Sequence, residues 1–97
     1  MEDQAIIDLY FARSEQALEE TDRKYGPYCR SIAEHILRNV QDTEECVNDT
    51  WLRAWNAMPP QRPGVLSAFL GKITRNLSLD RCRLVRAEKR GGGAMML

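Results

Sequence analysis

The sequence predicts an all-α fold: a compact bundle of three main helices preceded by a short N-terminal helix. Apolar residues recur three and four positions apart through most of the 97-residue chain, and no alternating run of β-branched and aromatic residues lasts five positions. Proline and glycine cluster at residues 26–27, 59–64 and 91–93, where helices would bend or end. A chain of this length forms one domain around one modest core.

The first two helices are expected over roughly residues 2–12 and 15–38. Ser14 separates them and has the short polar side chain that N-cap positions favour. The Gly26–Pro27 pair should kink or break the second helix, because proline lacks a backbone donor and clashes with the preceding turn. The positions expected to be buried are Ile6, Leu9 and Tyr10, followed by Leu18, Tyr25, Cys29, Ile32 and Ile36.

The third helix is expected to begin at Asp42, because Glu45 follows three positions later as in a capping box. Prolines and a glycine between residues 59 and 64 then impose a loop that lasts to about Val65. The stripe of this helix that should face the core consists of Val47, Trp51, Ala54 and Met58.

The fourth helix is expected to open near Ser67 and to continue to about Lys89, which gives a length of about 35 Å. The glycines at 91–93 should stop it, since glycine gives the backbone many alternatives to the helical conformation. We therefore assign residues 1–90 to the helical domain and residues 91–97 to a flexible glycine-rich tail or a truncation scar. The apolar positions expected to face the core are Leu66, Leu70, Ile73, Leu77 and Leu84.

Composition argues against a secreted, membrane-bound, metal-binding or enzymatic protein. No run approaches the roughly 18 apolar residues of a membrane span and no signal peptide is evident, so we expect a cytoplasmic protein without a membrane partner. Cys29, Cys46 and Cys82 form no CxxC pair, which favours buried thiols over disulfides or a zinc site with His35. No catalytic motif or nucleotide-binding glycine loop is present, so we expect neither an enzyme nor a cofactor.

Charge is divided between the two halves of the chain, although the formal net charge is zero. Residues 1–49 carry 12 acidic and five basic side chains, whereas residues 50–97 carry nine basic and two acidic ones. This division indicates two surfaces for two partners, of which the basic one is a candidate for nucleic acid. Asp80 interrupts the apolar face of the fourth helix and is expected to pair with an arginine, because a lone buried carboxylate is costly.

Two sets of residues at helical spacing, each forming a stripe along one side of a helix, carry this difference in charge. The acidic stripe, on the third helix, consists of Glu45, Asn48, Asp49, Leu52 and Asn56. The basic stripe, on the fourth helix with Arg75 beside it, consists of Lys72, Asn76, Leu79, Arg83, Arg86 and Arg90. Either stripe could be an ordinary solvated helix face. The acidic stripe also suits a basic protein partner, and seven cations against two acids between residues 72 and 90 favour nucleic-acid contact.

The chain resembles the region-two domain of bacterial RNA polymerase sigma factors of the extracytoplasmic-function (ECF) group. Residues 42–55, DTEECVNDTWLRAW, resemble the second conserved helix of that domain, with an acidic start, an amide–acid pair and Leu-Arg-Ala-Trp. Residues 66–81, LSAFLGKITRNLSLDR, resemble the helix that follows. Tyr25-Gly26-Pro27 matches the first conserved helix, so the resemblance covers nearly the whole chain in order.

The resemblance implies a transcription initiation factor that binds core RNA polymerase and promoter DNA. The third helix would dock on a coiled coil of the polymerase β′ subunit through Glu45, Asn48, Asp49, Leu52 and Arg53. The fourth helix and the loop before it would recognise and help to melt the promoter −10 element through the non-template strand. Its DNA-binding residues would be Gln61, Arg62, Lys72, Arg75, Asn76, Leu79, Arg83 and Arg86. An anti-sigma factor is a further partner that the resemblance suggests.

The chain departs from the family pattern in three places. Gly71 and Lys72 stand where a Tyr-Arg pair is common, Phe69 replaces a usual tryptophan, and residues 59–64 are unusually proline-rich. The 97 residues also contain no second helical domain of the kind that reads the −35 element. Two alternatives remain: a stand-alone small helical DNA-binding regulator, and a protein-only helical adaptor or decoy of the polymerase site.

Overall fold

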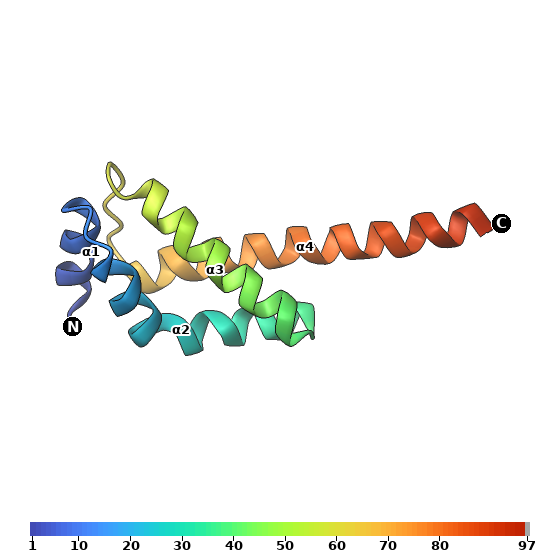
Figure 1. Cartoon of the computed structure of the whole chain (residues 1–97), viewed down its shortest axis with the longest axis horizontal. Helices are drawn as coiled ribbons and strands as arrows, with labels where there is room; N and C mark the ends of the chain where they lie inside the picture. Colours follow the sequence, from blue (N-terminus) through green and yellow to red (C-terminus); the bar gives the residue numbers. More distant parts are fainter. Residues whose placement is uncertain (97) are drawn as a thin grey trace.

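The structure, a computed structural model, describes the backbone of residues 1–96 and the side chains of residues 1–86. Its four helices are α1 (Asp3–Phe11), α2 (Gln16–Leu37), α3 (Val40–Ala57) and α4 (Leu66–Met96), and residues 1–96 contain no strand. The predicted all-α fold is therefore confirmed. Figure 1 shows α2, α3 and the first part of α4 packed together, with α1 at the end of the bundle and α4 extending beyond it. The molecule measures 55 × 24 × 21 Å.

The core lies where α1 meets α2, α3 and the start of α4. Tyr10 is fully buried, and its hydroxyl hydrogen-bonds with that of Thr21 at 2.7 Å, which satisfies both polar groups inside the protein. The core cluster consists of Ile6, Ile7, Tyr10, Ala17, Cys29, Val47, Trp51, Ala54, Met58, Leu66 and Leu70. It includes all four residues that the sequence predicts for the inner stripe of α3.

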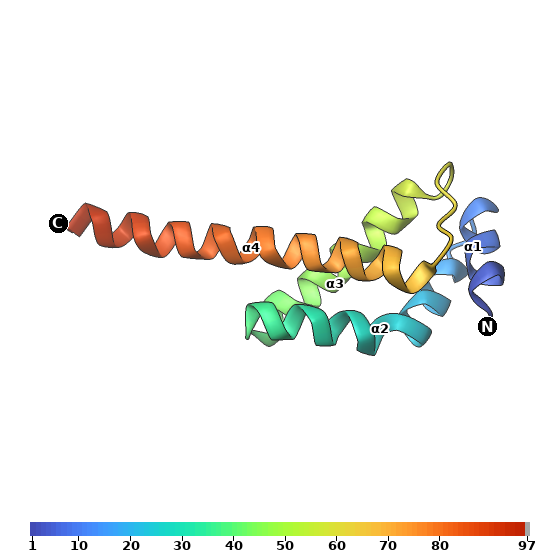
Figure 2. The same cartoon turned by 180° about the vertical axis from the view of Figure 1, so that it is seen from behind.

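The second helix is continuous, so the break considered at Gly26–Pro27 does not occur. Pro27 lies inside α2, and the α2 ribbon bends along its course instead (Figures 1 and 2). Ser14 lies one residue before the N-cap position, which Glu15 occupies. The Ser14 hydroxyl nevertheless accepts a hydrogen bond from the Gln16 amide at 3.3 Å, so it still caps the first turn.

The third helix begins two residues earlier than the sequence predicts. Asn39 is its N-cap, and the Asn39 side chain accepts a hydrogen bond from the Asp42 amide at 2.9 Å. Asp42 therefore lies in the first turn, where its charge complements the helix dipole. The prediction of a capping box starting at Asp42 was wrong because the helix already begins at Val40, so that Asn39 is the capping residue and the Asp42 amide donates to it.

The fourth helix differs from the prediction in its length and in its buried face. The helix continues through the glycines at 91–93 to Met96, since glycine disfavours a helix by only about 1 kcal/mol per residue relative to alanine and does not forbid it. Leu84 is 61% exposed, and Leu77 is only partly buried. Leu66 and Leu70 at the start of α4 are buried as predicted, and the residues that face the bundle after them are small, namely Gly71, Thr74 and Ser78.

Small hydroxyl side chains fill the contact between α3 and α4. The Thr50 and Thr74 hydroxyls lie 3.0 Å apart, and the Ser78 hydroxyl lies 3.2 Å from the Cys46 sulfur. The hydroxyls of Thr50, Thr74 and Ser78 can each also donate to the carbonyl four residues earlier in the same helix. These bonds satisfy the polar groups locally, so serine and threonine can be buried here at little cost.

Candidate functional site

The acidic stripe is fully displayed to solvent along α3. All five of its residues are exposed, as is Arg53 beside it, while the opposite side of the helix is buried. Leu52 is 58% exposed, although leucine side chains are more often buried in folded proteins. The predicted side of α3 thus presents both charge and apolar surface to a partner.

Two hollows lie beside the acidic stripe, between α3 and α4. The smaller, of about 140 Å³, is lined by Asp49, Leu52, Arg53, Asn56 and Leu77. The larger, of about 360 Å³, is lined by Cys46, Asp49, Leu77, Asp80, Arg81 and Leu84. Leu77 and Leu84 were expected in the core, and the structure places them next to the acidic stripe instead. The sequence missed them as surface residues because their helical spacing resembles that of core leucines.

Arg81 joins the start of α3 to α4. Its guanidinium donates to Asp42 at 3.0 Å and also contacts Glu45. Burial alone would lower the pKa of Arg81, but the hydrogen bonds and charges of the two carboxylates outweigh burial and raise it. Glu45 is therefore committed within the fold, whereas Asp49 forms no ion pair with any described side chain. Asp49 is consequently the more available acid of the stripe.

The basic stripe is also exposed over the part whose side chains are described. Lys72, Asn76, Arg83 and Arg86 are exposed and Leu79 is partly buried, while Arg90 lies outside the described side chains. Asp80 pairs with Arg83 at 3.4 Å, as expected, but both groups are exposed and the pair is not part of the core. The stripe therefore carries a net positive charge on an accessible surface.

Several cations of the bundle are neutralised by internal ion pairs, but those of the basic stripe are mostly not. Arg23, Arg30, Arg62 and Arg81 each contact at least one carboxylate. Among the described side chains, Lys72, Arg75 and Arg86 contact no carboxylate and donate no hydrogen bond. Their charge is available to an external anion, which is what a phosphate-contacting surface requires.

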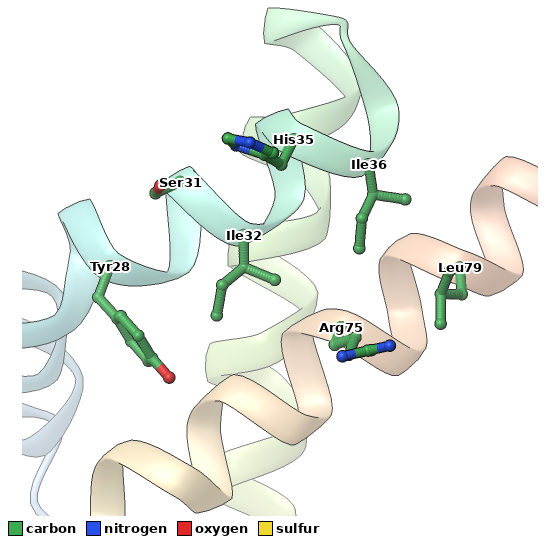
Figure 3. A pocket seen from close by; sticks show the side chains of 7 residues that line it. All are labelled: Tyr28, Ser31, Ile32, His35, Ile36, Arg75 and Leu79. Atoms are coloured by element: carbon green, nitrogen blue, oxygen red, sulfur yellow. The ribbon is translucent and has the colours of Figure 1, made fainter.

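A third hollow lies on the surface between α2 and α4 and has an apolar floor. Figure 3 shows Ile32 and Ile36 projecting from α2 toward Leu79 and Arg75 of α4. Its volume is about 390 Å³, and its lining residues are Tyr28, Ser31, Ile32, His35, Ile36, Arg75 and Leu79. Arg75 and Leu79 thus lie at the edge between this hollow and the basic stripe.

The loop between α3 and α4 carries the remaining two predicted DNA-binding residues. The Gln61 side chain is exposed, and its backbone amide donates to the Ala57 carbonyl at 2.9 Å. The Arg62 guanidinium donates to Asp8 of α1 at 2.9 Å and to Gln4 at 3.1 Å. Gln61 is thus available to a ligand, whereas Arg62 is engaged with the protein itself.

The described residues offer little support for other kinds of site. Their His, Cys, Asp and Glu side chains form no cluster of three that could hold a metal ion. None of the described helices combines the length and apolar character that crossing a bilayer requires. Burial raises the pKa of the Cys29 and Cys46 thiols, which disfavours the reactive thiolate form.

Comparison with known protein families gives one result. Residues 22–88, more than half of the chain, match the family model described as sigma-70 region 2. The matched segment contains the acidic stripe, the α3–α4 loop and the described part of the basic stripe, and it leaves out α1. Comparisons with curated proteins and with solved structures found no match.

Proposed function

Because this chain belongs to the sigma-70 region 2 family and is thereby a transcription initiation factor domain, we propose that its two stripes divide the work of initiation. The acidic stripe would dock on the β′ coiled coil of core RNA polymerase. The basic stripe and the α3–α4 loop would bind the non-template strand of the −10 element and help to melt it. The ECF type, a cytoplasmic location and an anti-sigma partner stay predictions.

One observation carries the proposal: two accessible surfaces of opposite charge lie on adjacent helices. On α3, Asp49 has no internal ion pair and lies beside the exposed Leu52. On α4, Lys72 and Arg75 contact no carboxylate among the described side chains. Charged groups that form no ion pair among the described side chains are available to external partners, which supports one partner for each surface.

The docking surface combines charge with apolar area. Asp49 can attract a basic partner and hold its register, while Leu52, with Leu77 in the hollow next to it, supplies surface that gains from burial. Asn48 and Asn56 can form hydrogen bonds at the rim. A coiled coil fits this arrangement because a helical ridge can enter the hollow between α3 and α4.

Docking is tested by retention of the chain on an immobilised β′ coiled-coil fragment. Asp49→Ala combined with Leu52→Ala should weaken binding by about tenfold or more, because it removes an apolar anchor and its neighbouring charge. Glu19→Ala with Val40→Ala removes one exposed acid and one exposed apolar residue away from the stripe, and should bind like the wild type. Undiminished binding of the stripe variant would make the docking assignment wrong.

The DNA surface combines phosphate contacts with a group that can read a base edge. Lys72 and Arg75 provide uncommitted charge, and the exposed amide of Asn76 lies between them and the rest of the stripe. An amide can donate to and accept from a base edge, which lets it replace the pairing that an unstacked base has lost. Affinity that depends on these cations should fall steeply as salt concentration rises.

Base reading is tested by selecting single-stranded −10-like oligonucleotides from a randomised library at low salt. Asn76→Ala should flatten the selected sequence preference, and Asn48→Ala, which removes an exposed amide from the acidic stripe, should leave it unchanged. A preference that survives Asn76→Ala would exclude Asn76 as the reading residue. Tight duplex binding without polymerase would instead favour the stand-alone regulator, and no salt-dependent strand binding would favour the protein-only adaptor.

A further inference from the structure

The α3–α4 loop lies directly beside α1, as both views of the molecule show (Figures 1 and 2). Arg62, in the middle of the loop, forms the contact. Its guanidinium donates to Asp8 at 2.9 Å and to Gln4 at 3.1 Å, and its Cζ lies 4.5 Å from the centre of the Phe11 ring. Two hydrogen bonds and a cation–π contact hold one planar group in a defined orientation.

The start of the loop has a second attachment to the N-terminal segment. Arg13, in the turn after α1, donates hydrogen bonds to the backbone carbonyls of Trp55 and Met58, both at 2.8 Å. Its guanidinium also stacks on the Trp55 ring, with Cζ 3.8 Å from the ring centre. Carbonyls at the end of a helix lack partners within it, so Arg13 closes the C-terminal end of α3 where the loop begins.

Both attachments are anchored in the core. Ile6, Ile7 and Tyr10 are buried with at most 1% exposure, so α1 cannot shift without disturbing the packing of the bundle. The attachments come from residues before 22, and therefore from outside the segment that matches the family model. The loop itself lies inside that segment.

We propose that α1 is a latch that holds the α3–α4 loop in the shape needed for base selection, with Arg62 as its positioning residue. This inference rests on the proposed function, in which the loop meets an unstacked promoter base. It gives Arg62 a role different from the phosphate or base contact that the sequence suggests. The side chain acts through Asp8 and Phe11 and keeps Gln61 at the surface where a base can reach it.

Substitution of Asp8, the partner of Arg62, should have opposite effects on DNA binding depending on whether Arg62 contacts DNA or positions the loop. If Arg62 bound DNA, Asp8→Asn would weaken the hold of residue 8 on its guanidinium and remove a nearby negative charge, so strand affinity would stay equal or rise. If Arg62 positions the loop, Asp8→Asn loosens the loop and lowers base preference, as Arg62→Ala does. The pair is exposed, so neither change should unfold the domain.

The experiment measures binding of the full chain to a preferred single-stranded oligonucleotide and to its scrambled counterpart, over a range of salt concentrations. Asp8→Asn and Arg62→Ala should each reduce the ratio of the two affinities by about threefold, since exposed ion pairs and cation–π contacts are individually weak. The double variant should reduce it no further, because both changes open the same latch. The salt dependence of Arg62→Ala should equal that of the wild type.

Glu19→Gln is the matched control, because it removes one exposed carboxylate from the N-terminal half without touching the loop. It should keep the wild-type ratio. Arg62→Lys keeps the charge but loses the planar stacking on Phe11, and should behave like Arg62→Ala.

The outcomes separate the latch from the function on which it rests. One set of results would overturn the latch and make Arg62 a phosphate contact. The wild-type chain would prefer the first oligonucleotide, Asp8→Asn would bind it with equal or higher affinity, and Arg62→Ala would lower the slope of its salt dependence by about one. A wild-type chain without any preference would overturn the proposed function and the latch with it. Faster hydrogen exchange at the Gln61 amide in Asp8→Asn, with preference reduced, would support the latch.

Discussion

The Tyr28 hydroxyl of α2 lies against Gly71 of α4, so close that a β-carbon at position 71 would be 2.7 Å from it. Gly71 is buried, whereas Tyr28 is 46% exposed and lines the hollow between the two helices. The glycine therefore lets α2 and α4 approach with the tyrosine ring between them. The tyrosine expected at position 71 from the family resemblance would have no room in this packing.

This contact predicts that substitutions at the two positions are coupled. In a Tyr28→Phe background only ring carbons at 3.3 and 3.4 Å remain near the new β-carbon, so Gly71→Ala should raise the free energy of unfolding by up to about 1 kcal/mol, because alanine favours a helix more than glycine does. With Tyr28 present the gain should be smaller, since the hydroxyl must first move aside. Urea denaturation of the four variants measures the coupling, and equal effects in both backgrounds would contradict it.

Tyr25 should ionise at unusually high pH. Burial, followed by the hydrogen bonds from its hydroxyl to the Asp3 carboxylate, raises the pKa of Tyr25 to about 12. The unfolded chain would ionise near pH 10, so this group stabilises the fold below about pH 10 and the stabilisation is lost as pH rises toward 12. In Asp3→Asn the pKa should fall but stay above 10, because burial persists.

The Tyr25 titration can be followed by NMR with tyrosine labelled at Cζ. Tyr25→Phe assigns the signal by removing it. If the Tyr25 pKa were the same in Asp3→Asn as in the wild type, the carboxylate would have no part in the shift.

The three cysteines should differ sharply in reactivity. Cys29 and Cys46 are buried and burial raises the pKa of both thiols, whereas Cys82 is partly exposed beside a small hollow at the end of α2. In the native protein the Cys82 thiol should react with a disulfide reagent at least about tenfold faster than the other two. Cys82→Ser should abolish this fast phase, and urea should make all thiols reactive. A fast phase that persists in Cys82→Ser would show that a buried thiol opens readily.

Two arginines adopt the left-handed backbone conformation, and glycine should affect them in opposite directions. Arg13 has φ 56° and Arg38 has φ 54°. Arg38 is exposed at the end of α2, so Arg38→Gly should stabilise the protein by up to about 1 kcal/mol by relieving the strain. Arg13→Gly relieves the same strain but loses the contacts to Trp55 and Met58, and should destabilise by about 1–2 kcal/mol.

Thermal denaturation of the two glycine variants provides the comparison, and each serves as the control for the other. Equal stabilisation of both variants would mean that the Arg13 contacts contribute nothing beyond backbone conformation.

The sequence predicts α3 well because its buried and exposed sides differ strongly in polarity. Val47, Trp51 and Met58 mark one side, and charged or amide residues occupy the other. The start of this helix is predicted less accurately, because Asn39 and Asp42 are both favourable N-cap residues. Only the structure shows that the Asn39 side chain accepts a hydrogen bond from a free amide of the first turn.

Hydrophobic spacing correctly predicts that Leu66 and Leu70 are buried at the start of α4, but it does not predict how the buried side continues. Thr74 and Ser78 are buried with their hydroxyls satisfied by carbonyls of the same helix, so they fill a close helix contact without an apolar signal. Leu84, which carries that signal, is exposed. The Arg62 contact was equally hidden, since it joins exposed polar residues 54 and 58 positions apart.

The extension of α4 beyond the bundle has a consequence for how the protein behaves in solution. Its radius of gyration is 15.6 Å, whereas a compact domain of about 100 residues has one of about 13 Å. A monomer of 11.2 kDa should therefore elute from a size-exclusion column ahead of globular standards of its mass, where it could be mistaken for a dimer. Light scattering or sedimentation equilibrium, which measure mass independently of shape, are the methods that should assign its oligomeric state.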